Sequence, residues 1–158
     1  MKYFAYGMNT NLDGMAGRCP TAVCLGPAWI DGYEFVFRTH ADIAKSPGSV
    51  CHGVLWDITK EDLQSLDMLE GYPYYYTRFR VRVNLGNHFV YALTYQMNDQ
   101  SCIQEPGLGY LEMVREGYTQ NGVPTNQIDQ AINMVCSSLT KTPVEYLFTQ
   151  YATTKDFV

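Results

Sequence analysis

The segment Thr77–Val83, with the sequence TRFRVRV, alternates between apolar or β-branched side chains and arginines. Successive side chains of a β-strand point to opposite faces, so this period of two predicts a strand with one face toward a core and the other toward solvent. Leu85-Gly86-Asn87 supplies turn residues directly after it, and the largely apolar run His88–Met97 follows. The two segments together predict a β-hairpin.

Further strands are expected on the N-terminal side of this hairpin. Asp31-Gly32 lies between two strand-like runs, and because both residue types tolerate positive φ, the pair predicts a tight hairpin turn. Thr39–Ser49 contains Pro47-Gly48 and is expected to be a loop. The expected strands are Lys2–Tyr6, Ala22–Ile30, Tyr33–Arg38 and Val50–Ile58.

The helix predictions begin with a capping pattern. Thr59 is followed three positions later by Asp62, and an apolar stripe then runs to Leu69 before Gly71, which predicts a short helix over Lys60–Leu69. Strands precede most helices, an order that predicts one α+β domain over residues 1–158, with a largely antiparallel, curled sheet and helices outside it. Asn9–Gly17 is expected to be a loop or a short helix, and the later helices are expected at Leu108–Tyr118, Gln127–Leu139 and Val144–Tyr151.

Composition excludes several classes of protein. The 158 residues carry 11 Lys and Arg against 16 Asp and Glu, a formal net charge of −5, which argues against nucleic acid as a partner. No run approaches the ~18 apolar residues of a membrane span, and the N-terminus lacks a signal-peptide pattern, so a soluble, unexported protein with no membrane partner is expected. The five cysteines are odd in number and form no C-x-x-C pair. Reduced thiols in the cytoplasm are therefore predicted.

Residue types that carry chemistry are sparse. Thirteen tyrosines accompany only 2 Trp and 7 Phe, which indicates a polar, aromatic-lined cleft. His40-Ala41-Asp42 is a weak metal pattern beside ordinary loop polarity, and no metal site is predicted. Cys51 and His52 are adjacent in an expected strand, so they point to opposite faces and form no Cys–His dyad.

Glu70 is the main candidate for catalysis. It lies at the end of the predicted helix Lys60–Leu69, where the helix dipole disfavours a negative charge. The aromatic segment Tyr72-Pro73-Tyr74-Tyr75-Tyr76 follows and could shield the carboxylate from water. Both effects would raise the pKa of Glu70 toward neutrality, which suits a general base. Taken alone, the local pattern fits a solvated glutamate beside a tyrosine-rich surface loop better than it fits a catalytic residue.

The segment Tyr6-Gly7-Met8-Asn9 is a second candidate, placed where the first strand ends. A glycine followed by short polar residues can turn backbone N–H groups inward to bind a carboxylate or an oxyanion. A purely structural turn explains one glycine as well.

Several segments in order resemble the γ-glutamyl cyclotransferase family, including its AIG2-like members. Residues 3–9, YFAYGMN, are similar to the family's Y-F-A-Y-G-S-N opening, and residues 53–71 resemble its G-V-L-Y…L-D-x-x-E-G block, whose glutamate is the acid/base. Arg18-Cys19-Pro20 with residues 25–28, and Pro106, Tyr110, Gly117 and residues 122–124, match further family segments. The likeness covers residues 3–126 and favours the catalytic interpretation of Glu70.

This resemblance implies a fold, a reaction and a set of site residues. The fold would be a six-stranded or similar closed, barrel-like mixed sheet with peripheral helices, without metal or cofactor. The substrate would be a small γ-glutamyl amide, whose α-amine attacks its own γ-carbonyl to release 5-oxoproline and an amine. Glu70 would move the proton, Tyr6, Gly7, Met8 and Asn9 would hold the carboxylate or oxyanion, and Tyr3, Tyr76 and Tyr110 would line the pocket.

The sequence departs from the family pattern at two positions. Met8 replaces the usual Ser, and Gly107 replaces the Ser after Pro106. These changes leave the leaving group open, and they leave two alternatives: a small-ligand binding module on the same fold, or amide cleavage on a larger γ-glutamylated substrate. The sequence also leaves a homodimer open.

Overall fold

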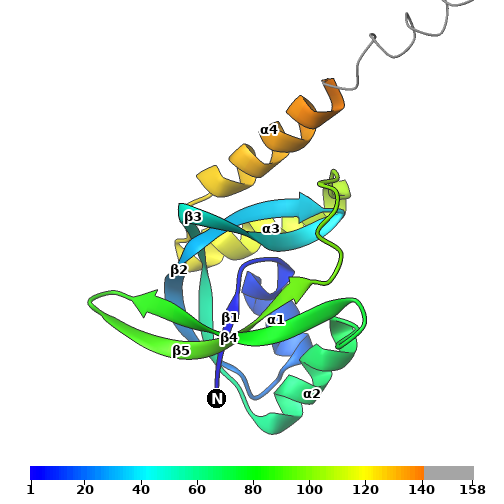
Figure 1. Ribbon diagram of the computed structural model, residues 1–158. Coiled ribbons are helices and arrows are strands. Elements are labelled where there is room, and N and C mark those ends of the chain that lie inside the picture. Colours follow the sequence, from blue (N-terminus) through cyan, green and yellow to red (C-terminus); the bar gives the residue numbers. More distant parts are fainter. Residues whose placement is uncertain (141–158) are drawn as a thin grey trace, which may run out of the picture.

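The computed structural model describes residues 1–140. Its centre is a closed barrel with the strand order β1-β3-β2-β4-β5 (Figure 1). Neighbouring strands are antiparallel except β1 and β5, which pair in parallel. The α+β prediction and the closed sheet are confirmed, with five strands in the described part. The strands are β1 (Lys2–Ala5), β2 (Val23–Arg38), β3 (His40–Asp57), β4 (Tyr76–Leu85) and β5 (His88–Met97).

The predicted hairpin at Asp31-Gly32 and the predicted loop Thr39–Ser49 are both wrong. β2 runs without interruption through Asp31-Gly32, where the register with β3 shifts and Gly32 has a φ of 80°. The positive φ that suggested a turn therefore serves a β-bulge, which bends the strand around the barrel. The actual turn lies at Thr39, with a φ of 69°, between Arg38 and His40. Thr39–Ser49 belongs almost entirely to β3.

The β4–β5 hairpin forms as predicted. Its ladder runs from Tyr76 paired with Met97 to Leu85 paired with His88, and Gly86 takes a φ of 59° in the turn. Val83 is fully buried while Arg80 and Arg82 are exposed, as the alternation of TRFRVRV predicts.

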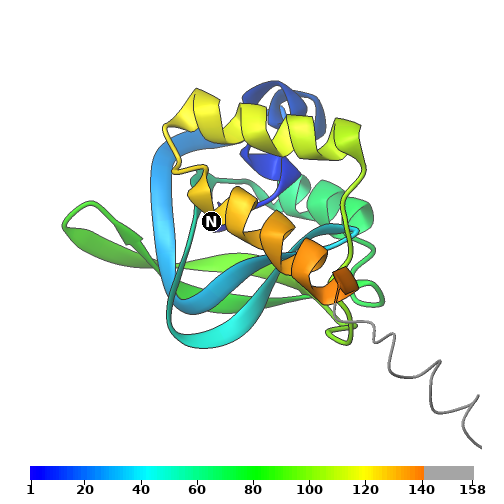
Figure 2. The same ribbon diagram turned by 90° about the horizontal axis from the view of Figure 1, so that it is seen from above.

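The helices lie outside the barrel. Helix α2 begins with the predicted capping box between Thr59 and Asp62, and a short 3-10 helix and α1 occupy the region predicted as a loop or short helix. Figure 2 shows α3 and α4 over the same side of the barrel. The bounds are Met8–Thr10 for the 3-10 helix η1, then α1 (Leu12–Arg18), α2 (Lys60–Leu69), α3 (Leu108–Asn121) and α4 (Asn126–Thr140). The helix predicted at Val144–Tyr151 lies outside the described residues.

The core fills the barrel and extends beneath α3. Phe4, Phe37 and Leu55 are fully buried inside the sheet, and Tyr118 of α3 joins them. A Cβ on Gly117 would come within 2.5 Å of both the Asn11 nitrogen and the Thr10 hydroxyl. Glycine at this position therefore lets α3 pack directly on η1, which follows β1.

No helix within residues 1–140 is long and apolar enough to cross a membrane. The prediction of a single domain over residues 1–158 stays a prediction, because the structure describes only part of that range.

Candidate active site

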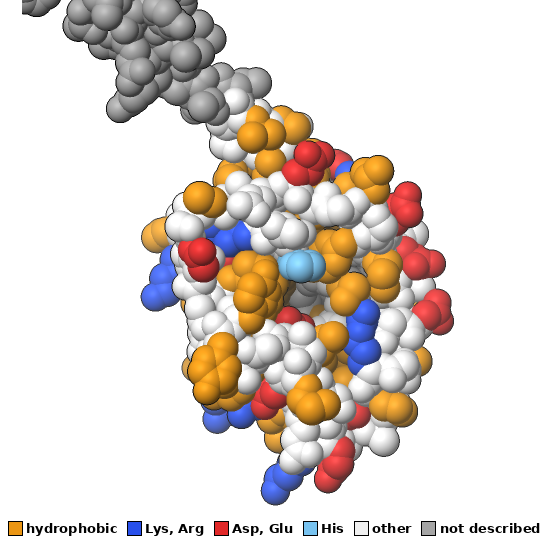
Figure 3. All heavy atoms as spheres, turned by 90° about the vertical axis from the view of Figure 1, so that its right-hand side faces the viewer, with side chains coloured by type: hydrophobic (Ala, Val, Ile, Leu, Met, Phe, Trp, Pro, Cys, Tyr) orange, Lys and Arg blue, Asp and Glu red, His pale blue; other side chains and the backbone are white. Residues whose placement is uncertain are grey.

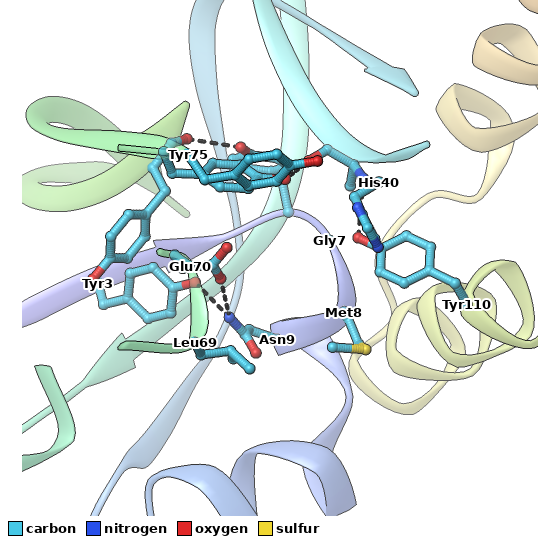
Figure 4. A pocket seen from close by; sticks show the side chains of 13 residues that line it. Tyr3, Gly7, Met8, Asn9, His40, Leu69, Glu70, Tyr75 and Tyr110 are labelled. Atoms are coloured by element: carbon cyan, nitrogen blue, oxygen red, sulfur yellow. Dashed lines mark hydrogen bonds between the residues drawn. The ribbon is translucent and has the colours of Figure 1, made fainter. Parts of the chain in front are cut away.

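Helix α2 places Glu70 at one end of the barrel. Glu70 is the C-cap residue of the helix, and its backbone N–H donates to the Leu66 carbonyl at 2.9 Å. Gly71 then takes a φ of 62° and turns the chain away. The backbone of Glu70 is thereby fixed, and its carboxylate points into a cavity (Figure 4).

The cavity has a volume of about 200 Å³ and opens on the surface as a hollow (Figure 3). Its thirteen lining residues fall into three groups. The floor consists of six residues that are each at most 6% exposed: Tyr3, Tyr6, Asn9, Ala41, Tyr76 and Tyr95. The rim consists of the exposed residues His40, Leu69 and Tyr75 together with the partly buried Met8. Gly7, Glu70 and Tyr110, all partly buried, complete the lining.

Asn9 connects the floor to Glu70. Its side-chain nitrogen donates to the Glu70 carboxylate at 2.9 Å and to the Tyr3 hydroxyl at 3.1 Å. Its side-chain oxygen accepts from the Arg18 guanidinium at 3.0 Å. Because Arg18 occupies that oxygen, the amide nitrogen is left facing Glu70, and the three residues form a chain that orients the carboxylate.

Burial raises the pKa of Glu70 from its ordinary value of 4.5 to about 7. The Asn9 hydrogen bond and the Arg18 charge act in the opposite direction and are outweighed. The direction agrees with the sequence prediction, and the main cause is the removal of water from around the carboxylate. A carboxylate in this range can accept and return a proton near neutral pH.

Two tyrosine hydroxyls hold the opposite wall through the backbone of Ala41. The Tyr76 hydroxyl donates to the Ala41 carbonyl at 3.0 Å, and the Tyr110 hydroxyl accepts from the Ala41 N–H at 3.0 Å. The Tyr6 hydroxyl donates to the Tyr95 carbonyl at 2.7 Å. These phenols are therefore held in place, and burial raises the pKa of each of them, so they stay protonated at neutral pH.

Gly7 lies where the chain passes between β3 and α3. A Cβ at this position would approach the Ala41 Cβ to 2.7 Å and the Tyr110 hydroxyl to 3.1 Å. Only glycine lets the segment Tyr6–Asn9 lie this close to the cavity wall. The glycine chosen from the sequence thus has a steric role that one motif could not reveal.

All eight residues predicted for the site line this one cavity: Tyr3, Tyr6, Gly7, Met8, Asn9, Glu70, Tyr76 and Tyr110. The expectation that the whole segment after Glu70 shields it is wrong for Tyr72, Pro73 and Tyr74, which are exposed and do not line the cavity. Tyr72 and Tyr74 are 37% and 90% exposed. Tyr72 instead lies under the Arg78 guanidinium, 4.6 Å from ring centre to charge.

Sequence reasoning missed Tyr95, His40, Ala41 and Leu69 as lining residues. Tyr95 lies in the largely apolar segment His88–Met97 and has no distinguishing local signal, because its place in the cavity depends on barrel closure. His40 was assigned to a loop, whereas it begins β3 and its ring lies edge-on to Tyr110 with centroids 5.0 Å apart.

Asp67 also has a larger role than the sequence suggested. Its carboxylate accepts from the Tyr95 hydroxyl at 2.7 Å and from the Arg78 guanidinium at 2.8 Å, while its backbone carbonyl accepts from the Tyr72 N–H at 2.9 Å. It lies three residues before Glu70. The last turn of α2 is therefore bound to both β4 and β5, which fixes the place where Glu70 enters the cavity.

Within residues 1–140, no three His, Cys, Asp or Glu side chains gather closely enough to hold a metal ion. Cys51 is fully buried, and burial raises the pKa of its thiol well above the ordinary value. A thiol in this state is a poor nucleophile.

Comparison with known proteins gives consistent results. Gamma-glutamylcyclotransferases of Bos taurus and Homo sapiens are 29% and 28% identical over 137 residues, which is 77% of this chain and 72% of each relative. A solved structure of a gamma-glutamyl cyclotransferase has a TM-score of 0.73 and 25% identity, covering 83% of this chain and 85% of that one. The family model of gamma-glutamyl cyclotransferase, AIG2-like proteins matches residues 3–117, and the chain therefore belongs to that family.

Proposed function

We propose that the protein releases 5-oxoproline from a γ-glutamyl amide, with Glu70 as the acid/base. The observation that carries the proposal is the Glu70 carboxylate inside the tyrosine-lined cavity, held by Asn9 and with a pKa raised to about 7. Family membership and the relatives named as gamma-glutamylcyclotransferases support the reaction class.

The reaction requires few catalytic groups from the protein, because the nucleophile and the electrophile belong to one substrate molecule. The substrate α-ammonium loses a proton to Glu70, and the resulting amine attacks the γ-carbonyl carbon. The C–N bond of the five-membered lactam forms, and the γ-oxygen carries the negative charge. Ring closure within one bound molecule avoids the entropic cost of bringing two reactants together.

Collapse of this intermediate breaks the bond to the leaving nitrogen. Glu70 returns its proton to that nitrogen, so the amide N–H becomes a free amine. The lactam nitrogen then loses its second proton, and the released amine takes up that proton, directly or through solvent, to become an ammonium at neutral pH. Glu70 ends ionised, as it began, and the protons of the substrate are all found in the 5-oxoproline and the released ammonium.

The floor and the segment Tyr6–Asn9 suit the remaining tasks. The buried phenols of Tyr3, Tyr6 and Tyr76 exclude water around the reacting atoms, which strengthens electrostatic interactions there. The Tyr6–Asn9 backbone lies at the end of β1 beside Glu70, where its N–H groups can stabilise the substrate carboxylate or the developing oxyanion. Gly7 keeps that backbone against the cavity.

A cytoplasmic location is part of the proposal. All five cysteines are free, and three of them, Cys24, Cys102 and Cys136, are exposed. Free exposed thiols persist in a reducing compartment, which supports this location.

The test is 5-oxoproline release from γ-glutamyl amino acids, γ-glutamylamines and glutathione, with the Glu70→Gln variant beside the wild type. We expect release from at least one substrate, and a loss of at least ~10³-fold in the variant, since general acid–base catalysis contributes up to ~10⁴-fold. Glu61→Gln, an exposed position in the first turn of α2, is the control and should keep full activity. No release from any substrate, or full activity in Glu70→Gln, would contradict the proposal; tight binding without turnover would indicate a binding module instead.

A further inference from the structure

The cavity leaves one direction open for the part of the substrate that departs. This inference rests on the proposed function, in which the γ-carbonyl carbon and the leaving nitrogen both lie within reach of the Glu70 carboxylate. The six floor residues are buried and close the inner end. The leaving group must therefore extend past the rim, toward the hollow seen in Figure 3.

The rim presents mainly apolar surface to that group. Leu69 is 47% exposed and Tyr75 is 52% exposed, although both line the cavity. Met8 is half-buried against the core, and Figure 4 shows Met8 and Leu69 below the Glu70 carboxylate with Tyr75 above it. A ligand that covers exposed apolar side chains gains free energy in proportion to the area it removes from water.

Charged leaving groups have few partners at the rim. The cavity lining contains no Lys, Arg or Asp; Glu70 and His40 are its charged or ionisable side chains apart from the phenols. His40 lies next to Tyr110, across the opening from Leu69 (Figure 4). Outside the lining, the Arg18 guanidinium donates to Asn9, and its charge acts on Glu70 and Tyr110. A neutral polar side chain directed toward Met8 and Leu69 would lose hydration without gaining a partner.

Met8 adds adaptability to this surface. A methionine side chain is unbranched and polarizable, so it can pack against apolar groups of different shapes. The serine of the motif that residues 3–9 resemble would place a hydroxyl here instead.

We propose that the rim selects γ-glutamyl substrates whose leaving group carries an apolar side chain, with Met8 and Leu69 as specificity-determining residues. The floor then binds the γ-glutamyl part that all substrates share, and the rim distinguishes among leaving groups.

The test compares γ-glutamyl-leucine with γ-glutamyl-asparagine, whose leaving groups have similar shapes and differ in polarity. We expect kcat/KM to favour the leucine conjugate about tenfold in the wild type, a ratio within the range that hydrophobic pockets achieve. Met8→Ser should reduce that ratio to about threefold or less. Because both substrates are measured on one sample, the ratio does not depend on how much of a variant folds.

Met68→Ser is the matched control. Met68 adjoins Leu69 but is 83% exposed and does not line the cavity. Its ratio should equal that of the wild type. A wild-type ratio near one, or an equal fall in Met68→Ser and Met8→Ser, would overturn the inference.

The variant Leu69→Lys tests whether a new charge at the rim creates a preference for an acidic leaving group. Lysine at the last position of α2 is compatible with the helix, since a cation is favoured at a C-terminus. We expect the variant to raise kcat/KM for γ-glutamyl-glutamate relative to γ-glutamyl-leucine by about tenfold. An unchanged ratio would contradict the assignment of Leu69.

A γ-glutamyl-methylamide substrate separates this inference from the proposed function, because methylamine is too small to reach the rim. Turnover of the methylamide with equal rates for the leucine and asparagine conjugates overturns the inference and leaves the proposed function standing. If neither the methylamide nor the other conjugates yield 5-oxoproline, the proposed function fails and the inference fails with it.

Discussion

The floor and the rim of the cavity are built from the same short stretches of chain. Each rim residue directly adjoins a partly or fully buried residue of the site in sequence: Met8 beside Asn9, His40 beside Ala41, Leu69 beside Glu70, and Tyr75 beside Tyr76. The inner residues are held by hydrogen bonds, such as Asn9 to Glu70 at 2.9 Å and Tyr76 to Ala41 at 3.0 Å. The rim offers mainly apolar surface to solvent. One backbone framework can thus keep the reaction constant while neighbouring side chains change the leaving group.

After the loss of Glu70 itself, the largest effect should come from disturbing Gly7, which adjoins the floor residue Tyr6. Gly7→Ala places a Cβ 2.7 Å from the Ala41 Cβ, which is too close, so the segment Tyr6–Asn9 must shift relative to Ala41 and leave its position in the cavity lining. We expect kcat/KM for 5-oxoproline release to fall more than about hundredfold, as a displacement of about 1 Å can cost that much. Gly17→Ala, where a Cβ meets nothing within 4 Å, should keep normal activity. Equal activity of the two variants would show that the approach of Gly7 is unimportant.

A second effect concerns the stability cost of the buried carboxylate. The folded protein holds Glu70 protonated up to a pH of about 7, whereas an unfolded chain ionises it near 4.5. Because the unfolded chain releases the Glu70 proton at a lower pH than the folded protein, the free energy of unfolding decreases as pH rises from 4.5 to 7. Above pH 7 the contribution of Glu70 changes little. The free energy of unfolding of Glu70→Gln should therefore exceed that of the wild type by about 2–3 kcal/mol at pH 8 and by much less at pH 5.

Urea unfolding at several pH values measures this difference. Glu61→Gln serves as the control, because Glu61 is exposed and its substitution should give a difference that does not follow this pH dependence. If Glu70→Gln were no more stable than wild type at pH 8, the carboxylate would not be buried in the way the structure shows.

The third prediction concerns the support behind the floor. Asp67→Asn removes the charge that pairs with Arg78 and weakens the bond to the Tyr95 hydroxyl. The last turn of α2 should loosen, so we expect kcat to fall about tenfold with KM changed less than about twofold. Asp57→Asn removes the exposed partner of Lys2 and of the N-terminal ammonium; neither Asp57 nor Lys2 lines the cavity, so both constants should stay unchanged. Similar losses in the two variants would indicate a general loss of stability.

The smallest predicted effect tests the chain from Arg18 to Glu70. The Arg18 charge lowers the pKa of Glu70, and its guanidinium holds Asn9 in the orientation that also lowers it. Arg18→Met should therefore move the pH midpoint of kcat/KM upward, by about half a unit. Arg115→Met, which breaks the ion pair with Asp129 between α3 and α4, should leave the midpoint in place. A downward shift in Arg18→Met would contradict the chain.

The sequence predicted local structure best where one signal had one meaning. The alternation of Thr77–Val83 and the cap formed by Thr59 and Asp62 both gave the observed elements. Asp31-Gly32 misled because positive φ serves a bulge as well as a turn, and the choice depends on how far β2 pairs with β3. The segment Thr39–Ser49 could not be recognised as a strand, because its strand structure likewise depends on pairing with β2.

The site was predictable to the extent that its residues lie in two motifs. Tyr6–Asn9 and Glu70 were identified from their segments, and the family resemblance brought them together. Tyr95 and Ala41 could not be placed, because strands distant in sequence bring them to the cavity when the barrel closes. The steric role of Gly7 likewise depends on Ala41, which no local pattern connects to it.

The central claim is that Glu70 acts as a base from a water-shielded position with a pKa of about 7. The pH dependence of kcat/KM for 5-oxoproline release tests it most directly, between pH 5 and 9. The account predicts a rate that rises about tenfold per pH unit below 7 and levels above it, and a residual rate without that midpoint in Glu70→Gln. A flat profile, a midpoint near 4.5, or the same midpoint in Glu70→Gln would contradict it.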